Sequence, residues 1–410
     1  MDINQIARRR LTVTLFLAQS FFSAAMIVSF TVLPILAARL SGQDSAAGLP
    51  STISLVGRAA AAYPFGWLMD RIGRRLGLSL GYGMGAAGMA LSGWGILVGS
   101  FAWLMVGVAL FGMGRGVAEL GRYVAAEVQP VENRAKAIGL IVFAGTVGSV
   151  GGPLLVAPSS RLAERFGVLA DSGPFWLGAA LMAVGLFLLW TLLRPDPQTL
   201  IVAETVDGEP VTASGISLWH LFADAKVLLA LSSMAIGQMV MVLIMVITPL
   251  HMDHQAHGAQ AISLVIMAHT LGMFGLSWLT GGLIDRYGRI TIIFIGAFLL
   301  VFSAVMTPLV AGVPLLAAAL FLLGLGWNFC FVAGSSLLTD SIAAGDKGRV
   351  QGAAEVIVAL SSGAGSLGSG AVFAGGGMIA VSGIGLALVL LLVAGGAWFS
   401  WTRRTTLEPV

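Results

Sequence analysis

Long apolar segments, separated by short polar ones, recur along the whole of this chain. Most of them hold about 20 residues, the length that an α-helix needs to cross the hydrocarbon core of a bilayer. The pattern predicts membrane helices at residues 11–36, 50–69, 77–99, 101–126, 135–157, 174–193, 227–250, 259–284, 290–310, 314–337, 351–373 and 378–401. We therefore expect an all-α membrane protein with twelve transmembrane helices in two six-helix halves.

The short polar segments form two alternating sets that differ in basic residues. One set holds most of the arginines and lysines near the helix ends: Arg8 to Arg10, Arg71, Arg74, Arg75, Arg134, Lys136, Arg286, Arg289, Lys347, Arg349, Arg403 and Arg404. The other set holds little beyond Arg39, Arg161 and Arg165. Because basic loops stay on the cytoplasmic side, we predict a bacterial inner (plasma) membrane protein with both termini in the cytoplasm.

A long polar stretch, residues 194–225, interrupts the pattern near the middle of the chain. We expect it to be a cytoplasmic linker between an N-terminal half, residues 1–193, and a C-terminal half, residues 226–410. A repeated loop supports this division: residues 66–75 read GWLMDRIGRR, and residues 281–289 read GGLIDRYGR. Duplicated halves of this kind are typical of secondary transporters.

The composition excludes several functional classes. Hydrophobic residues make up 57% of the chain and charged residues 10%, whereas soluble domains carry about 25% charged residues. The net charge is only +3, so we expect the lipid bilayer, and not nucleic acid, as the partner of the surface. The single cysteine, Cys330, excludes an intrachain disulfide. No set of nucleophile, base and orienting group is visible, so we predict that the protein is not an enzyme.

The two repeated loops resemble the signature of the major facilitator superfamily, Gly-x-x-x-Asp-Arg-x-Gly-Arg-Arg. The resemblance covers the whole chain and implies transport by alternating access, in which two halves rock about a site near the membrane midplane. In a short cytoplasmic turn the aspartate and arginines can pair with one another and with neighbouring helix ends. We expect Asp70, Arg71, Arg74, Asp285 and Arg286 to latch one gate conformation; alternatively, the arginines only enforce the topology.

Charged residues also lie inside the predicted spans. Arg58 is in the second predicted helix, and the spacing of Arg115, Glu119 and Arg122 puts them on one face of the fourth. Buried charges in a bilayer are costly, and they usually pair or line a water-filled path. We expect Arg58, Arg115 and Glu119 either to line a central cavity, where they attract an anion or relay protons, or to neutralise one another as structural ion pairs.

Methionine and histidine gather in the seventh and eighth predicted helices. Met241 and Met245 are four residues apart, as are His269 and Met273, so each pair shares one helix face. A rise of about 1.5 Å per residue puts Met241 and His269 both about 14 Å below the outer surface. Thioethers with imidazole select Cu(I) among biological metals, so these four residues are the predicted metal site. The alternative is that the methionines only fill space between packed helices.

A short loop at the outer end of these two helices adds further candidates. His251, Met252, His254 and His257 are spaced to capture a metal ion and to pass it to Met245. The alternative is that they are ordinary solvated residues.

The pairs Met241-x-x-x-Met245 and His269-x-x-x-Met273 resemble the paired motifs of CcoA-type copper importers, a branch of the same superfamily. The resemblance implies that these four residues are copper ligands. It also implies that copper is the transported substrate and not a permanently bound cofactor. A cytoplasmic copper acceptor would then receive the ion, and the copper would supply the assembly of cbb-type cytochrome c oxidase.

Other relatives in the same broad family are associated with riboflavin uptake. The alternative function is therefore an organic-solute carrier, for riboflavin or a drug-like compound. Such a carrier would use Arg58, Arg115, Glu119 and aromatic residues such as Trp67 and Tyr63 for its substrate. The methionines and histidines would then be packing residues.

Overall fold

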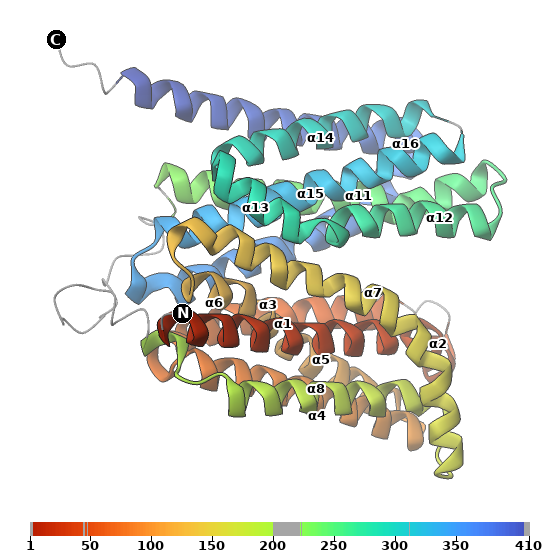
Figure 1. Ribbon diagram of the computed structural model, residues 1–410. Coiled ribbons are helices and arrows are strands. Elements are labelled where there is room, and N and C mark those ends of the chain that lie inside the picture. Colours follow the sequence, from red (N-terminus) through yellow and green to blue (C-terminus); the bar gives the residue numbers. More distant parts are fainter. Residues whose placement is uncertain are drawn as a thin grey trace. The chain divides into compact units, whose positions relative to one another are not determined.

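The structure is a computed structural model that describes residues 3–43, 46, 48–199, 222, 224–310 and 312–405. All regular structure in this part of the chain is helical (Figure 1). The α-helices are α1 (Ile3–Phe30), α2 (Leu33–Ser41), α3 (Leu49–Ile72), α4 (Arg74–Leu97), α5 (Phe101–Ala118), α6 (Gly121–Glu127), α7 (Arg134–Arg165), α8 (Gly173–Leu192), α11 (Ala225–His254), α12 (Ala259–Thr270), α13 (Ser277–Tyr287), α14 (Arg289–Leu309), α15 (Val313–Ser341) and α16 (Lys347–Thr405). Short 3₁₀ turns are η2 (Val131–Asn133), η3 (Ala170–Ser172) and η5 (Ala344–Asp346), and η4 (Leu271–Gly275) is a π-turn.

The predicted spans correspond either to single helices or to broken ones. The first span consists of α1 followed by α2, the fourth of α5 and α6, and the eighth of α12, η4 and α13. The last two spans lie in α16, where Gly376 and Gly377 leave the helical conformation. The prediction of an all-α fold with twelve membrane helices is confirmed.

Mean hydropathy alone identifies fewer spans. Eight helices of the described part are long and apolar enough to cross a membrane, or nine if the bent pair in the eighth span counts as one. This number counts α16 as one helix, although α16 contains two of the predicted spans. It omits α3, which contains Arg58, and the glycine-rich α4, because charge and glycine lower the mean hydropathy.

Contacts divide the chain into two compact units. Unit 1 contains Met1–Pro130, Leu140–Ser214 and Ala343–Ala359, and unit 2 contains Val131–Gly139, Gly215–Ile342 and Leu360–Val410. Each unit thus follows one half of the chain except for two exchanged segments, one at the start of α7 and one at the start of α16. The predicted linker, 194–225, lies largely outside the described residues, and the predicted domain boundaries stay a prediction.

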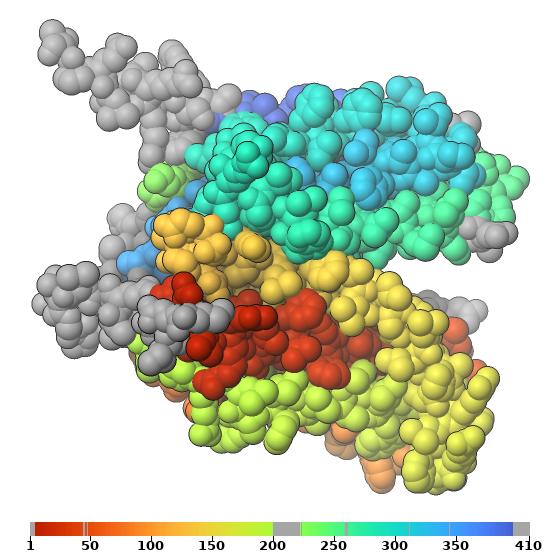
Figure 2. Space-filling model, viewed as in Figure 1, coloured from red at the N-terminus to blue at the C-terminus, as the bar shows by residue number. Residues whose placement is uncertain are grey.

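Helix α15 lies at the centre of unit 2, where it packs against α11, α12, η4 and α14 (Figure 1). The close approach of α15 and η4 depends on glycine. A Cβ atom added to Gly272 would meet the backbone of Phe321, and one added to Gly324 would meet the backbone of His269 and Met273. In the space-filling view, α12 and α13 form part of the near surface of this unit, in green to teal (Figure 2).

Candidate functional site

In unit 1 the signature loop is tied to the start of α16. The Asp70 carboxylate accepts hydrogen bonds from the backbone N–H groups of Gly348 and Arg349, at 3.0 and 2.9 Å. It also pairs with Arg74 at 2.7 Å, and Arg74 in turn pairs with Glu127 at 3.0 Å. Burial raises the pKa of Asp70, although Arg74 and the two backbone N–H groups oppose this shift. The carboxylate therefore caps the N-terminus of α16, where the helix dipole favours negative charge.

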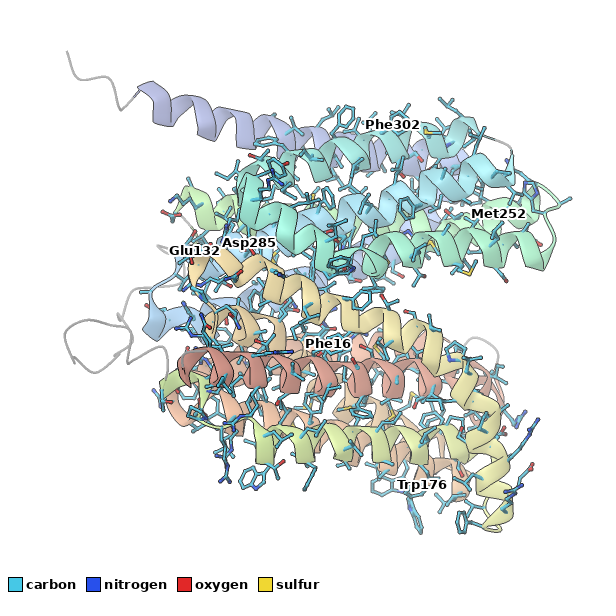
Figure 3. All side chains as sticks on the ribbon, in the orientation of Figure 1. Phe16, Glu132, Trp176, Met252, Asp285 and Phe302 are labelled. Carbon is cyan, nitrogen blue, oxygen red and sulfur yellow. The ribbon has the colours of Figure 1, made fainter. Side chains whose placement is uncertain are left out.

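Unit 2 repeats this arrangement at the start of α7. The Asp285 carboxylate accepts hydrogen bonds from the backbone N–H groups of Ala135 and Lys136, at 3.2 and 2.8 Å. It also lies 3.3 Å from Arg289, which has the same place in the repeat as Arg74. Figure 3 shows Asp285 on α13 beside the segment that contains Glu132. The sequence repeat is thus also a repeat of helix capping.

The other two arginines of the predicted gate lie against aromatic rings. The Arg71 guanidinium is 3.8 Å from the centre of the Trp67 ring, and the Arg286 guanidinium is 5.3 Å from the centre of the Tyr287 ring. Both rings are exposed, so these are cation–π contacts at the surface of their units. The contacts that a latch requires are made by the two aspartates and by Arg74.

Five charged side chains form one buried cluster in unit 1. Arg58 pairs with Glu119 at 2.5 Å and with Glu355 at 3.0 Å. Arg115 pairs with Glu119 at 2.8 Å, and Arg122 pairs with Glu355. Three arginines therefore share two carboxylates, which leaves one positive charge in excess.

Sequence reasoning missed Glu355, which is completely buried in the first part of α16. A signal for it exists in the charge count. Arg58, Arg115 and Arg122 lie in predicted spans, and so do two carboxylates, Glu119 and Glu355, which the apolar surroundings favour as partners. In the structure these five side chains pair with one another.

His269, near the end of α12, offers one nitrogen to a ligand. Only 2% of the residue is exposed. Its Nδ1 lies 3.0 Å from the backbone carbonyl oxygen of Leu320 in α15, and because a carbonyl oxygen only accepts, Nδ1 carries the proton. Nε2 then has a free lone pair, and it is buried with no hydrogen-bond partner in the part of the chain that the structure describes. An imidazole whose second nitrogen donates to a backbone carbonyl is held as metal-binding histidines usually are.

Met241 and Met245 lie on the face of α11 that packs against α15. Two contacts define this face: a serine hydroxyl of α15 reaches the Met234 sulfur at 3.8 Å, and Trp327 Nε1 donates to Gln238 Oε1 at 2.8 Å. Met241 and Met245 follow these residues at helical spacing and continue the same face. Met241 is buried and Met245 is half-buried.

The same two contacts show that α11 and α15 run antiparallel, since Met234 lies against Ser335 and Gln238 against Trp327. Met241 and Met245 therefore lie toward the N-terminal half of α15.

Helices α12 and η4 also pack against α15. The His269 imidazole lies against the Leu320 carbonyl, and the backbone of both His269 and Met273 lies against Gly324. The pairing of Met241 with His269 stays a prediction. Among the described residues α11 and α12 pack on α15 and scarcely on each other, so α15 connects the two motifs.

The outer loop does not gather its histidines into one ligand set. The rings of His251 and His254 lie 6.2 and 5.8 Å from the ring of Phe373, and His257 is half-buried. Met252, at the outer end of α11, is completely buried (Figure 3). In the part of the chain that the structure describes, no three or more His, Cys, Asp or Glu side chains are grouped so as to hold a metal ion.

Comparison with known proteins places this chain among transporters. The family model of the Major Facilitator Superfamily matches residues 15–366 and 230–409. The chain is 34% identical over 391 residues to the uncharacterised MFS-type transporter YdeG of Bacillus subtilis, a match that covers 93% of this chain and 90% of the relative. It is 26% identical over 352 residues to the riboflavin transporter RfnT of Brucella anthropi, with 86% of each chain covered.

Solved structures share the fold. The human organic anion transporter MFSD10 superposes with a TM-score of 0.76 at 18% identity, covering 95% of this chain and 99% of that one. A bacterial homologue of the iron transporter ferroportin, in an outward-facing state, gives a TM-score of 0.73 at 16% identity with 95% and 99% covered. At such identities the likeness concerns the fold alone.

Proposed function

Because the chain belongs to the major facilitator superfamily, whose members are transporters and not enzymes, we propose that it is a secondary transporter that imports copper as Cu(I). The proposal assigns it to the bacterial inner membrane, where it works by alternating access. Copper is the cargo, and Met241, Met245, His269 and Met273 are its ligands.

The observation that carries this proposal is the state of His269. Its imidazole is buried, its Nδ1 is fixed by a backbone carbonyl, and its Nε2 lone pair has no partner among the described residues. A buried acceptor without a donor is costly unless a ligand satisfies it. Met245 lies on the face of α11 that packs against the same helix, α15, and a thioether with an imidazole is a ligand set that favours Cu(I).

Neutral ligands suit a carrier. Copper would enter past His251 and His254 and bind to Met241, Met245, His269 and Met273 on its way inward. It would then pass to a cytoplasmic acceptor for cytochrome oxidase assembly, as the resemblance to CcoA-type importers implies. The cluster around Glu355 has an excess of positive charge, so it repels a cation and lies outside this route.

The test is uptake of radioactive copper by bacterial cells that lack their own importer. We expect uptake with the unaltered protein and a loss of about tenfold or more in each of Met241→Ala, Met245→Ala, His269→Ala and Met273→Ala, because each change removes a ligand. Protein levels in the membrane are matched by immunoblot.

Met267→Ala is the matched control for these variants. Met267 lies on α12, two residues before His269, but it is 62% exposed on the outside of its unit. Its loss should leave uptake unchanged. Full uptake in all four ligand variants would reject the site, and absence of uptake by the unaltered protein would reject copper as the cargo.

Riboflavin import is the second candidate, because one relative is a riboflavin transporter. Unit 2 contains an aromatic group suited to a flat ring: Trp327 and Phe331 are stacked with centroids 4.8 Å apart, and Phe274 meets Trp327 edge-on at 5.8 Å. Riboflavin uptake that survives His269→Ala and is lost in Trp327→Ala would favour this second function over copper.

A further inference from the structure

Asn328, in the middle of α15, is a completely buried amide whose two N–H groups are both used. Its Nδ2 donates to the backbone carbonyl oxygen of Met273 at 2.7 Å and to the Ser277 hydroxyl oxygen at 2.6 Å. The Ser277 hydroxyl itself donates to the same Met273 carbonyl at 3.2 Å. Asn328 thus closes a three-membered hydrogen-bond network around the backbone of Met273.

Met273 needs such support because of the backbone in which it lies. It is the middle residue of the π-turn η4, and the span bends by 44° directly after that turn. A π-turn replaces the regular α-helical hydrogen bonds by wider ones, and such turns often occur at functional sites. Here the Met273 carbonyl accepts two side-chain hydrogen bonds, from Asn328 and Ser277.

The amide side of Met273 is held as well. Gly324, one turn before Asn328 in α15, lies so close to η4 that a Cβ atom there would come within 2.7 Å of the Met273 nitrogen. Asn328 bonds the carbonyl side of the same residue. The Cα atom of Met273, and with it the start of the thioether side chain, is thus fixed from two points of α15.

From these contacts we infer that Asn328 is the positioning residue of the Met273 thioether: it holds the π-turn in the conformation that aims this sulfur at the metal. This inference rests on the proposed function. Asn328 acts through Met273 and is not itself a copper ligand, because the soft Cu(I) ion selects sulfur and imidazole over an amide oxygen. The network also explains why an uncharged polar side chain is retained in a buried part of the membrane domain.

A measurement on the metal-free protein tests the hydrogen-bond network independently of metal binding. In the full-length protein labelled with [methyl-13C]methionine, Asn328→Leu removes both hydrogen bonds at nearly constant volume. We expect the methyl resonance of Met273 to shift and broaden in the metal-free variant, while that of Met234 stays in place. Met273→Leu assigns the resonance.

The second measurement is titration with Ag(I), a soft monovalent probe of the same ligands. We expect Asn328→Leu to bind Ag(I) about 10–100-fold more weakly, the usual effect of losing an outer hydrogen-bond partner of a metal ligand. Ser277→Ala, which removes one bond of the network, should have a smaller effect of the same kind. Thr339→Val is the control, because it removes another buried hydroxyl of α15 whose bond, 2.9 Å to the Ser335 carbonyl, lies outside the network.

An unchanged Met273 resonance in Asn328→Leu would overturn the inference, and so would a shift of all methionine resonances together, because the effect would then be general unfolding. Failure of the proposed function looks different. If the unaltered protein binds no Ag(I) but the Met273 resonance still responds to Asn328→Leu, copper transport is wrong while the positioning of Met273 stands.

Discussion

A single carboxylate, Glu355, pairs with two arginines that lie on different helices. Arg58 is in α3 and Arg122 in α6, and each bonds one of the two carboxylate oxygens. All three side chains are almost completely buried. The loss of one charge from such a group leaves the others without compensation in a medium of low dielectric.

The variant Glu355→Gln tests this arrangement. Removing one partner of a buried ion pair usually costs about 3–5 kcal/mol, so we expect a clear fall in the melting temperature of the purified protein. Asp171→Asn is the control, because the Arg39–Asp171 pair is exposed and such a pair contributes about 0–1 kcal/mol. Equal melting temperatures for the two variants would show that the buried Glu355 charge contributes no more to stability than the exposed Asp171 charge.

Individual residues show which contacts the sequence could predict and which it could not. The spacing of His269 and Met273 predicts that both side chains share one helix face; the structure shows the His269 imidazole and the Met273 backbone carbonyl in contact with α15. The partner of the His269 imidazole is a backbone carbonyl, at Leu320, and a carbonyl leaves no trace in the sequence. Glu355, one of the two partners of Arg58, is 297 residues away, and the sequence analysis did not predict it.

At the scale of elements, the two aspartates of the repeat cap helices that begin far away in the chain. Asp70 caps α16, and Asp285 caps α7. A carboxylate that accepts two backbone N–H bonds at a helix start is stabilised by the helix dipole as well as by the bonds. Each cap therefore stabilises the first turn of its helix.

Hydrogen exchange of the first turn of α16 measures the effect of the cap. Asp70→Ala removes both bonds, a loss of about 1–2 kcal/mol, so exchange at residues 348–352 should rise about 5–30-fold. Arg71→Ala is the control within the same loop, because Arg71 lies over Trp67 and should leave this turn unchanged. If both variants exchange alike, the cap is not what holds the turn.

The elements were predictable to different degrees. Most spans were found from the length of their apolar segments, because a bilayer of fixed thickness sets that length. The break at Gly376 and Gly377 falls in the gap between the predicted spans 351–373 and 378–401. The breaks between α1 and α2 and at η4 were not predicted, because they follow from local backbone geometry within continuous apolar sequence.

At the scale of the whole molecule, the exchanged segments make the two halves depend on each other. Residues 343–359 belong to unit 1 and supply Glu355 and the backbone groups that Asp70 caps. Residues 131–139 belong to unit 2 and supply the groups that Asp285 caps. Neither chain half therefore contains all of its own packed unit.

A chain cut within residues 200–221 tests this dependence. We expect the two fragments to co-purify and to restore transport when they are made together, because each completes the packing of the other. The N-terminal fragment alone should be degraded or aggregate, since Arg58 and Arg122 lose Glu355. An N-terminal fragment that is stable alone would contradict the dependence.

The exchange also has a consequence for biosynthesis. The ribosome completes the first half of the chain long before it reaches residue 343, so Arg58 and Arg122 lack Glu355 until α16 is inserted. Folding from the N-terminus, domain by domain, is the usual order for large proteins, and here it cannot finish the first domain. A chain truncated before Glu355 would thus leave three arginines of unit 1 with one carboxylate, Glu119, among the five charged side chains of the cluster.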